Sequence, residues 1–324
     1  MLGVAYRHIL AYSPRPMHEG SRRAIIAALS ANLGIAIVKF VGFFLTGATS
    51  MLAEAVHSVA DTGNQALLMV GAKRANRAPT AEHPFGYGRE RYFWSFVVAL
   101  VIFVLGGAFA AYEGIEKMLH PHPIDSPLIA IGILFFGASL ETWSFRTALV
   151  EARKLRGAQT WYEFIRHTKA AELPVILLED LGALVGLTFA LIGVTLAMVT
   201  GEPRFDALGS VAIGVLLIVI AFVLASEMRS LLIGEAASED EEAQIRAALL
   251  AGANVRRVIH MRTTHLGPEE LLLAAKIEFD ATLSFVQVAD EIDAAEARVR
   301  AVLPSARLIF LEPDIFRAER HSLS

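Results

Sequence analysis

The chain has 324 residues, of which 55% are hydrophobic and 19% are charged, and its mean hydropathy is +0.51. These values exclude an ordinary soluble domain of this length and indicate an integral membrane protein. The chain contains no cysteine, which excludes disulfides and thiolate metal ligands, and its formal net charge of -4 gives no indication of nucleic-acid binding.

The first 22 residues, MLGVAYRHILAYSPRPMHEGSR, lack the basic, apolar and small-residue pattern of a secretory signal, so we expect a short cytoplasmic N-terminal arm over 1–22. A bilayer core about 30 Å thick requires roughly 20 mainly apolar helical residues. Six later segments meet this requirement, at 24–44, 51–71, 92–112, 127–149, 174–200 and 208–225. They predict a six-helix transmembrane domain over 23–229, in contact with the lipid bilayer.

Lysine and arginine residues indicate how these segments are oriented. They gather before the first segment, between the second and third, and around the link between the fourth and fifth, whereas the other loops are nearly free of them. Because basic residues concentrate in cytoplasmic loops, this distribution predicts that both termini are cytoplasmic. We expect a multi-pass protein of the inner (plasma) membrane.

After the sixth segment the chain becomes polar, and its pattern predicts a soluble domain. Capping boxes at Ser238 with Glu241 and at Ser284 with Gln287 predict the starts of two helices. The stretches VRRVIHMRTTHLG, ELLLAAKIEFD and ARLIFLE are typical of strands. We therefore predict a small cytoplasmic αββαβ (ferredoxin-like) domain over 230–316, followed by a tail over 317–324.

The second segment is the least hydrophobic, and it contains the polar stretch EAVHSVADTGNQ. His57, Asp61 and Asn64 recur there every three or four residues, so they share one helix face. The fifth segment supplies Glu179 and Asp180. Ionised groups inside a bilayer are costly unless they face protein, water or a bound ion. His57 and Asp61 can reach a single ion, and a carboxylate from a facing helix could complete a tetrahedral site.

The same residues admit a second interpretation. The stripe could line a water-filled vestibule, or pair structurally with Lys39 of the first segment. Glu54 lies nearest the outer end of its helix and could simply be solvated. Asn64 and Gln65 suit helix packing or secondary ligation. Glu141 of the fourth segment could line an ion path or pair with Lys39.

Four stretches resemble a known family: SMLAEAVHSVADTGNQALLMVG in the second segment, HPFGYGRERYFWS before the third, DALGSVAIGVLLI in the sixth, and RTTHLGPEELLLAAKIEFD in the soluble domain. Over 21–314 the chain resembles the cation diffusion facilitator family. The resemblance implies export of a divalent metal in exchange for protons, by a secondary transporter rather than an enzyme. The metal is then cargo, and no resident cofactor is expected.

The fifth segment departs from the family pattern. The His-x-x-x-Asp of the second helix is present at His57 and Asp61, but its usual repeat in the fifth helix keeps only Asp180, because Ile176 occupies the histidine position. Glu179 could replace the missing ligand only in part, since adjacent helical residues point about 100° apart. This Glu-Asp variant resembles the branch that includes the human zinc transporter nine group.

Two other metal sites of the family are also depleted. In the second-to-third loop His83 remains, but Tyr87 occupies the next histidine position. Apolar residues occupy the histidine positions of the cytoplasmic strands, and we expect the nearby His260 and His265 to be surface or turn residues. The resemblance implies a homodimer formed through a cytoplasmic domain, and we expect no metal site in that domain.

We predict metal ligands at four positions: His57, Asp61, Asp180 and, with a weaker basis, Glu179. His57, Asp61 and Asp180 would also exchange protons, because metals and protons compete for the same lone pairs. Candidate secondary ligands are Glu54, Asn64, Glu141 and His83. The resemblance favours Zn²⁺ as cargo, whereas the lost histidine favours the harder Mn²⁺ or Fe²⁺. The remaining alternative is a membrane subunit or metal sensor of the same fold that does not transport.

Overall fold

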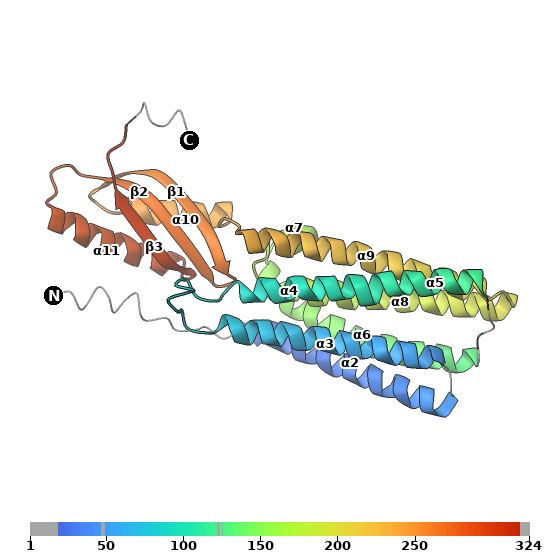
Figure 1. The fold of residues 1–324 in the computed structure, drawn as a ribbon. Coiled ribbons are helices and arrows are strands. Elements are labelled where there is room, and N and C mark those ends of the chain that lie inside the picture. Colours follow the sequence, from blue (N-terminus) through green and yellow to red (C-terminus); the bar gives the residue numbers. More distant parts are fainter. Residues whose placement is uncertain (1–18, 47–48, 122–123, 125, 318–324) are drawn as a thin grey trace. The chain divides into compact units, whose positions relative to one another are not determined.

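The structure is a computed structural model, and it describes residues 19–46, 49–121, 124 and 126–317 (Figure 1). The chain divides into two compact units. Of the residues that the structure describes, those within 19–80 and 90–232 form the membrane unit, and those within 81–89 and 233–317 form the sheet unit. Residues 81–89, which lie between the second and third membrane helices, thus belong to the sheet unit, which the local sequence pattern did not indicate.

Long helices build the membrane unit (Figure 1). In chain order they are α2 (Glu19–Thr46), α3 (Thr49–Ala75), α4 (Glu90–Val101), the π-helical η1 (Ile102–Ala108), α5 (Phe109–Leu119), α6 (Pro127–Arg156), the short α7 (Trp161–His167), α8 (Glu172–Thr200) and α9 (Arg204–Ile233). α4, η1 and α5 follow one another without a break and form one rod. Each of the six predicted segments lies inside one of these helices or this rod.

Helix lengths are sufficient for membrane crossing. Within the described residues, four helices are long and apolar enough to cross a bilayer: the α4–α5 rod, α6, α8 and α9. α2 and α3 contain 28 and 27 residues. This corresponds to about 40 Å of helix, which exceeds the thickness of the hydrocarbon core. α3 is less apolar because it carries the polar stripe.

The link between α6 and α8 contains α7, which the hydropathy pattern did not predict. The Thr160 hydroxyl accepts a hydrogen bond from the Glu163 N–H at 3.2 Å, and the Glu163 carboxylate accepts one from the Thr160 N–H at 2.7 Å. Phe164 of this helix is buried in the apolar cluster of the membrane unit. The Thr-x-x-Glu capping box is a local signal that could have identified this helix.

Apolar side chains fill one end of the membrane unit. The buried cluster there includes Ile25 of α2, Leu68 of α3, Val98 of α4, Ile176 of α8 and Leu224 of α9. All five are 7% exposed or less. Side chains packed together in this way close this end of the bundle as far as the described residues show.

Two ion pairs tie the helices together at the same end. Arg91 donates from Nε and Nη2 to the two carboxylate oxygens of Glu172, at 2.5 and 3.2 Å, and both side chains are buried. Arg166 of α7 pairs with Glu227 of α9. Removing one partner of a buried pair leaves an uncompensated charge, which costs about 3–5 kcal/mol. The first pair therefore fixes the starts of α4 and α8 relative to each other, and the second joins α7 to α9.

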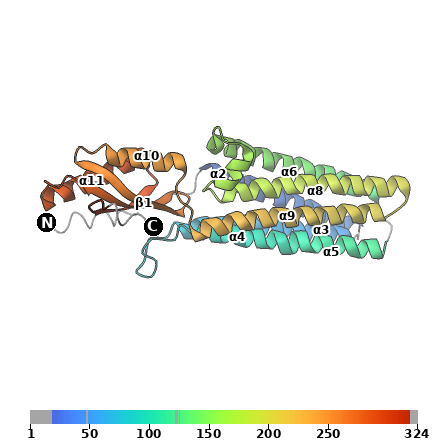
Figure 2. The same cartoon turned by 90° about the horizontal axis from the view of Figure 1, so that it is seen from above.

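α9 packs closely against both the α4–α5 rod and α8 (Figure 2). A Cβ atom added to Gly214 would lie 2.5 Å from the backbone nitrogen of Ala111. One added to Gly209 would lie 3.1 Å from the carbonyl oxygen of Phe189. The missing side chains let the helix backbones approach each other, as small residues do in membrane bundles.

The sheet unit contains α10 (Glu239–Leu250), β1 (Val255–Gly267), β2 (Glu270–Phe279), α11 (Phe285–Val302) and β3 (Ala306–Pro313). The sheet order is β1-β2-β3, with β1 and β2 antiparallel and β2 and β3 parallel. The parallel pair requires a crossover, which α11 provides. Both predicted capping boxes are present, at Ser238 with Glu241 and at Ser284 with Gln287. The predicted fold class, six membrane helices followed by αββαβ, is confirmed.

The core of the sheet unit lies between the strands and the two helices (Figure 1). Residues of β2 alternate between buried and partly exposed. The buried face carries Leu271, Leu273 and Ile277, and it packs in one cluster with Ile245 of α10 and Val299 of α11. This alternation is the expected pattern for a sheet that is covered on one side.

The segment 81–89 contacts the turn that joins β1 and β2. A Cβ atom added to Gly88 would lie 2.6 Å from the carbonyl oxygen of Leu266 and 3.1 Å from the Cα of Gly267. Two glycines therefore meet backbone to backbone at this contact. This close approach explains why the segment belongs to the sheet unit.

Candidate metal site in the membrane unit

Two neighbouring amides of α3 hold Glu179 of α8. Asn64 Nδ2 donates to Oε1 at 3.1 Å, and Gln65 Nε2 donates to Oε2 at 2.8 Å. Asn64 and Gln65 are 2% and 0% exposed, and Glu179 is 9% exposed. Both carboxylate oxygens of Glu179 are therefore bound by one helix, which makes this residue a bridge between α3 and α8.

Asp180 is held from a different direction. Ser144 of α6 donates its hydroxyl hydrogen to Oδ2 of Asp180 at 2.8 Å, and both residues are buried. Adjacent residues point about 100° apart on a helix. Glu179 consequently faces α3 and Asp180 faces α6, and the Glu-Asp pair of α8 reaches both neighbouring helices.

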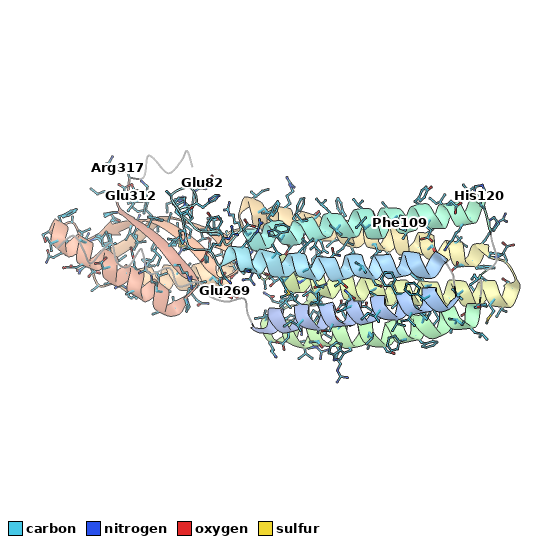
Figure 3. All side chains as sticks on the ribbon, turned by 60° about the horizontal axis from the view of Figure 1, so that its bottom comes forward. Glu82, Phe109, His120, Glu269, Glu312 and Arg317 are labelled. Carbon is cyan, nitrogen blue, oxygen red and sulfur yellow. The ribbon has the colours of Figure 1, made fainter. Side chains whose placement is uncertain are left out.

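A cavity of about 290 Å³ lies between the helices of the membrane unit. Its polar lining includes Asn32, Ser58, Asp61, Asn64, Glu141, Glu179 and Asp180. The cavity continues past Phe109 to Glu113 and Lys117 of α5 and to Asp206 at the start of α9. Figure 3 shows Phe109 on the α4–α5 rod and His120 just beyond the end of the rod. The cavity thus runs from the acidic groups toward the end of the bundle opposite the apolar cluster.

Carboxylates are concentrated at the inner part of this cavity. Asp61, Asp180 and Glu141 lie close enough to act electrostatically on Glu179. Like charges in a poorly hydrated interior repel strongly, so the cluster is stable only with bound protons, a bound cation or both. This property suits a site at which a metal and protons replace each other.

The structure assembles the predicted ligands only in part. Asp61, Glu179 and Asp180 line the same cavity, together with the secondary candidates Asn64 and Glu141. Among the described residues, no three His or acidic side chains are close enough to hold a metal ion. The four-residue ligand set therefore stays a prediction.

His57 and Glu54 belong to α3, but their side chains lie outside the described residues, as does the side chain of Lys39. Ile176, at the family's histidine position, is 0% exposed and belongs to the apolar cluster. It is therefore packing against neighbouring helices rather than lining the cavity. The second nitrogen ligand is replaced here by a core residue.

His83 has no role in the cavity. It lies exposed in the segment 81–89 of the sheet unit, where its ring contacts that of Tyr87 with a centroid distance of 4.6 Å. Tyr87 is the residue that occupies the family's second histidine position in this loop. An aromatic contact thus stands where the family's loop site would require two histidines.

The histidines of the sheet unit differ from each other. His260 is exposed and accepts a hydrogen bond from Arg262 Nε at 2.9 Å. His265 is 2% exposed, so the prediction of a surface or turn position was wrong for this residue. It lies in β1, whose end is covered by the chain entering α10, because the His265 N–H donates to the Glu235 carbonyl at 2.8 Å.

The acids near the end of β3 are engaged by a lysine. Lys276 Nζ donates to Glu312 at 2.8 Å and to Asp314 at 3.2 Å, and these bonds raise the pKa of Lys276. The hydrogen bond from the Ile315 N–H has the largest effect in lowering the pKa of Asp314, and the bond from Lys276 lowers it further. Figure 3 labels Glu312 in this part of the sheet unit. Both carboxylates therefore have a cationic partner from the protein itself.

Sequence reasoning missed two features of the membrane unit. Asn32 of α2 is 4% exposed and lines the cavity, although only its polarity inside an apolar segment could have drawn attention to it. The second missed feature is the buried ion pair between Arg91 and Glu172. No local pattern links residues 81 positions apart.

Comparison with known proteins gives a family and several relatives. The cation efflux transmembrane domain matches residues 25–233. The mitochondrial proton-coupled zinc antiporter SLC30A9 of Xenopus laevis is 32% identical over 289 residues, which are 88% of this chain and 52% of that protein. The cation-efflux pump FieF of Cronobacter sakazakii is 26% identical over 85% of this chain and 87% of its own length. The chain thus spans about half the length of the zinc antiporter relatives.

Among solved structures, a MamM CTD covers 25% of this chain and 100% of its own length. Its sequence identity is 20% and its TM-score is 0.24.

Proposed function

The chain belongs to the cation efflux (cation diffusion facilitator) family, and from this membership we propose that it exports a divalent metal cation in exchange for protons, with Zn²⁺ as the favoured cargo. The family consists of transporters, so the expectation of a transporter rather than an enzyme is confirmed. The predicted branch is also confirmed by the relatives named as SLC30A9.

One observation carries the proposal. Asp61, Glu179 and Asp180 lie on one cavity inside the membrane unit, and that cavity extends to only one end of the helix bundle among the described residues. A site that is open to one side and closed to the other by packed side chains is what alternating access requires. A purely structural role for the acids would not need this cavity.

Proton coupling follows from the chemistry of the ligands. Carboxylates and imidazole bind a metal only when deprotonated, so metal binding releases protons and metal release allows them to return. The reference pKa of a histidine side chain is about 6.5, close to physiological pH. His57, Asp61 and Asp180 therefore supply groups suited to this exchange. We propose that these three residues bind the cation and carry the protons.

The identity of the cargo is less constrained by the ligands than by the relatives. Relatives named as zinc antiporters and zinc transporters support Zn²⁺. The burial of Ile176 in the apolar cluster removes one nitrogen ligand and leaves oxygen donors in the majority. Oxygen donors suit Mn²⁺ and Fe²⁺ better than Zn²⁺, so these ions form the second candidate cargo.

We further propose the setting in which the transporter works. The distribution of basic residues supports cytoplasmic termini in an inner (plasma) membrane, with the sheet unit in the cytoplasm as a dimerisation module. With this orientation, the end of the bundle that carries Lys117 and Asp206 faces outward. The structure then corresponds to a state in which the site is accessible from outside.

The test uses proteoliposomes that contain the full chain and a pH-sensitive dye. Zn²⁺, Mn²⁺, Fe²⁺ and Co²⁺ are added in turn to the wild type and to the variants Asp61→Ala and Asp180→Ala. We expect proton flux that follows one metal and falls to background in both variants. The matched control is Glu116→Ala, because Glu116 is an exposed acid of α5 that does not line the cavity.

Normal flux in either cavity variant would remove that residue from the site. No flux with any metal, from protein shown to be folded, would favour a membrane subunit or sensor that does not transport. A response to Mn²⁺ but not Zn²⁺ would replace the favoured cargo and leave the exchange mechanism intact.

A further inference from the structure

Asn64 has a second polar group that the contact with Glu179 does not use. Its Nδ2 donates to Glu179, but its buried Oδ1 has no hydrogen-bond partner among the described residues. The residue is 2% exposed and lines the cavity beside Asp61 and Asp180. A buried amide oxygen without a partner is uncommon in folded proteins, because burial removes its bonds to water.

The orientation of this amide follows from its partner. A carboxylate accepts hydrogen bonds and does not donate them when it is ionised. Both amides present their nitrogen to Glu179, which is the arrangement that an ionised Glu179 requires, and each amide oxygen then faces elsewhere. Gln65 fixes the other oxygen of Glu179, so the carboxylate cannot turn away from Asn64.

The position of Asn64 along α3 also suits a metal ligand. It lies three residues after Asp61, so the two side chains share a face of α3. Asp180 reaches the same cavity from α8. The family's nitrogen ligand on α8 is absent, because Ile176 is packed into the apolar cluster. Among the described residues, the donor set of the cavity therefore lacks the nitrogen ligand of α8 and contains the Asn64 amide oxygen without a hydrogen-bond partner.

We propose that Asn64 supplies its amide oxygen as a ligand to the transported cation, beside the carboxylates of Asp61 and Asp180. Glu179 is then a positioning residue, which holds the amide nitrogen so that the oxygen remains available to the ion. This inference rests on the proposed function. It assigns Asn64 the coordination position that the buried Ile176 leaves vacant.

The assignment has a consequence for metal selectivity. An amide oxygen is a harder donor than an imidazole nitrogen, so its use favours Mn²⁺ and Fe²⁺ relative to Zn²⁺. Asn64 would therefore act as a specificity-determining residue. A residue that only packed α3 against α8 would influence stability without altering the ratio of affinities for two metals.

Gln65 provides a matched control. It makes the same kind of bond to Glu179, with a distance of 2.8 Å, it is also buried, and its Oε1 likewise has no hydrogen-bond partner among the described residues. It does not line the cavity among the described residues. Replacing Gln65 removes a bond to Glu179 without removing a cavity oxygen, whereas replacing Asn64 removes both.

The experiment measures equilibrium binding of Mn²⁺ and of Zn²⁺ to the detergent-solubilised full chain by titration calorimetry. The variants are Asn64→Ala, Asn64→His and Gln65→Ala, each with its thermal unfolding recorded. We expect Asn64→Ala to weaken binding by at least about 10–100-fold, the range seen when residues that support metal ligands are removed, and Gln65→Ala to weaken it less. We expect Asn64→His to raise the affinity for Zn²⁺ relative to Mn²⁺.

Equal losses of affinity in Asn64→Ala and Gln65→Ala, with an unchanged metal ratio in Asn64→His, would overturn the proposal and leave Asn64 as a packing residue. Absence of metal binding by the wild type would also overturn it. Flux assays separate this inference from the proposed function. If metal binding depends on Asn64 but no transport is measured, only the proposed function is contradicted. If transport is measured but metal binding does not change when Asn64 is replaced, only this inference is contradicted.

Discussion

At the scale of single residues, buried polar groups are positioned by donors from other helices or from nearby turns. Glu179 accepts from Asn64 and Gln65, and Asp180 accepts from Ser144. The residue types were visible in the sequence, but their partners were not. A carboxylate that is held by neutral donors keeps a defined position without being neutralised, which suits a site that must bind and release a cation.

The sheet unit contains a comparable arrangement at Asp280. The backbone N–H and then the hydroxyl of Thr282 donate to Oδ1 at 2.9 and 2.7 Å, and Arg256 donates to Oδ2 at 2.9 Å. Together these bonds lower the pKa of Asp280 far below its ordinary value, and the Thr282 N–H has the largest effect, followed by the Thr282 hydroxyl and then Arg256. The turn before α11 is thus stabilised by an ionised side chain.

The prediction for Asp280 concerns pH. Because the native pKa is lower than the unfolded value of about 3.9, ionised Asp280 stabilises the fold above about pH 4, and this contribution is lost as the pH falls through the native pKa. We expect Asp280→Asn to lower the unfolding temperature of the detergent-solubilised chain at pH 7. The difference from the wild type should shrink as the pH falls below about 4.

The control for this experiment is Asp290→Asn, since Asp290 is an exposed carboxylate of α11. Circular dichroism at several pH values gives the unfolding temperatures. A difference between wild type and Asp280→Asn that stays constant from neutral to acid pH would contradict the assigned role.

At the scale of elements, α9 depends on close backbone contacts. Gly214 allows the α4–α5 rod to approach at Ala111, and Gly209 allows α8 to approach at Phe189. The rod and α8 both line the cavity, so the position of α9 determines the shape of one cavity wall. Hydropathy predicted this helix, but it could not predict which of its faces would lie against each neighbour.

We expect Gly214→Val to destabilise the bundle. Its Cβ would lie 2.5 Å from the backbone nitrogen of Ala111, so the helices would have to separate. Overpacking of this kind costs about 1–3 kcal/mol. The measurement is the unfolding temperature of the full chain in detergent, followed by helical circular dichroism.

Gly132→Val serves as the matched control, because a Cβ atom on Gly132 of α6 would meet nothing within 4 Å. Removing a helical glycine at that open position should leave stability unchanged or raise it slightly. Similar behaviour of the two variants would show that the contact between α9 and the rod is looser than the structure indicates.

At the scale of the whole molecule, the membrane unit is divided along its length. The cavity occupies the half that contains Glu113 and Asp206, and the apolar cluster with the Arg91–Glu172 pair occupies the other half. The proposed exchange of a cation across the membrane requires that these two halves open alternately. The buried ion pair must then be rearranged whenever the closed end opens, because it joins α4 to α8.

Accessibility of single cysteines tests this division. The chain has no cysteine, so one introduced residue gives an unambiguous signal. We expect Ala110→Cys, which lies on the cavity, to react with a membrane-impermeant maleimide added from outside. Ala148→Cys should resist the reagent, because Ala148 is 0% exposed within the apolar cluster. The reverse result would mean that the protein in the membrane is open at the other end.

Sequence by itself determined most of the elements of this protein, with α7 as an exception. Runs of apolar residues predicted the membrane helices, capping boxes predicted where α10 and α11 begin, and three stretches typical of strands predicted the sheet, because each of these signals lies within a short window of the chain. The acids of α3 and α8 were also identifiable, since charged residues inside apolar segments are costly. Resemblance to a family then supplied an expectation for the function.

Only the tertiary structure decided how these elements meet. It showed that Glu179 binds two amides of α3, that Asp180 faces α6, and that the segment 81–89 belongs to the sheet unit. It also showed that Ile176 is part of the core and that His265 is buried. These outcomes depend on contacts between residues far apart in the chain, and local periodicity contains no information about which distant faces pack together.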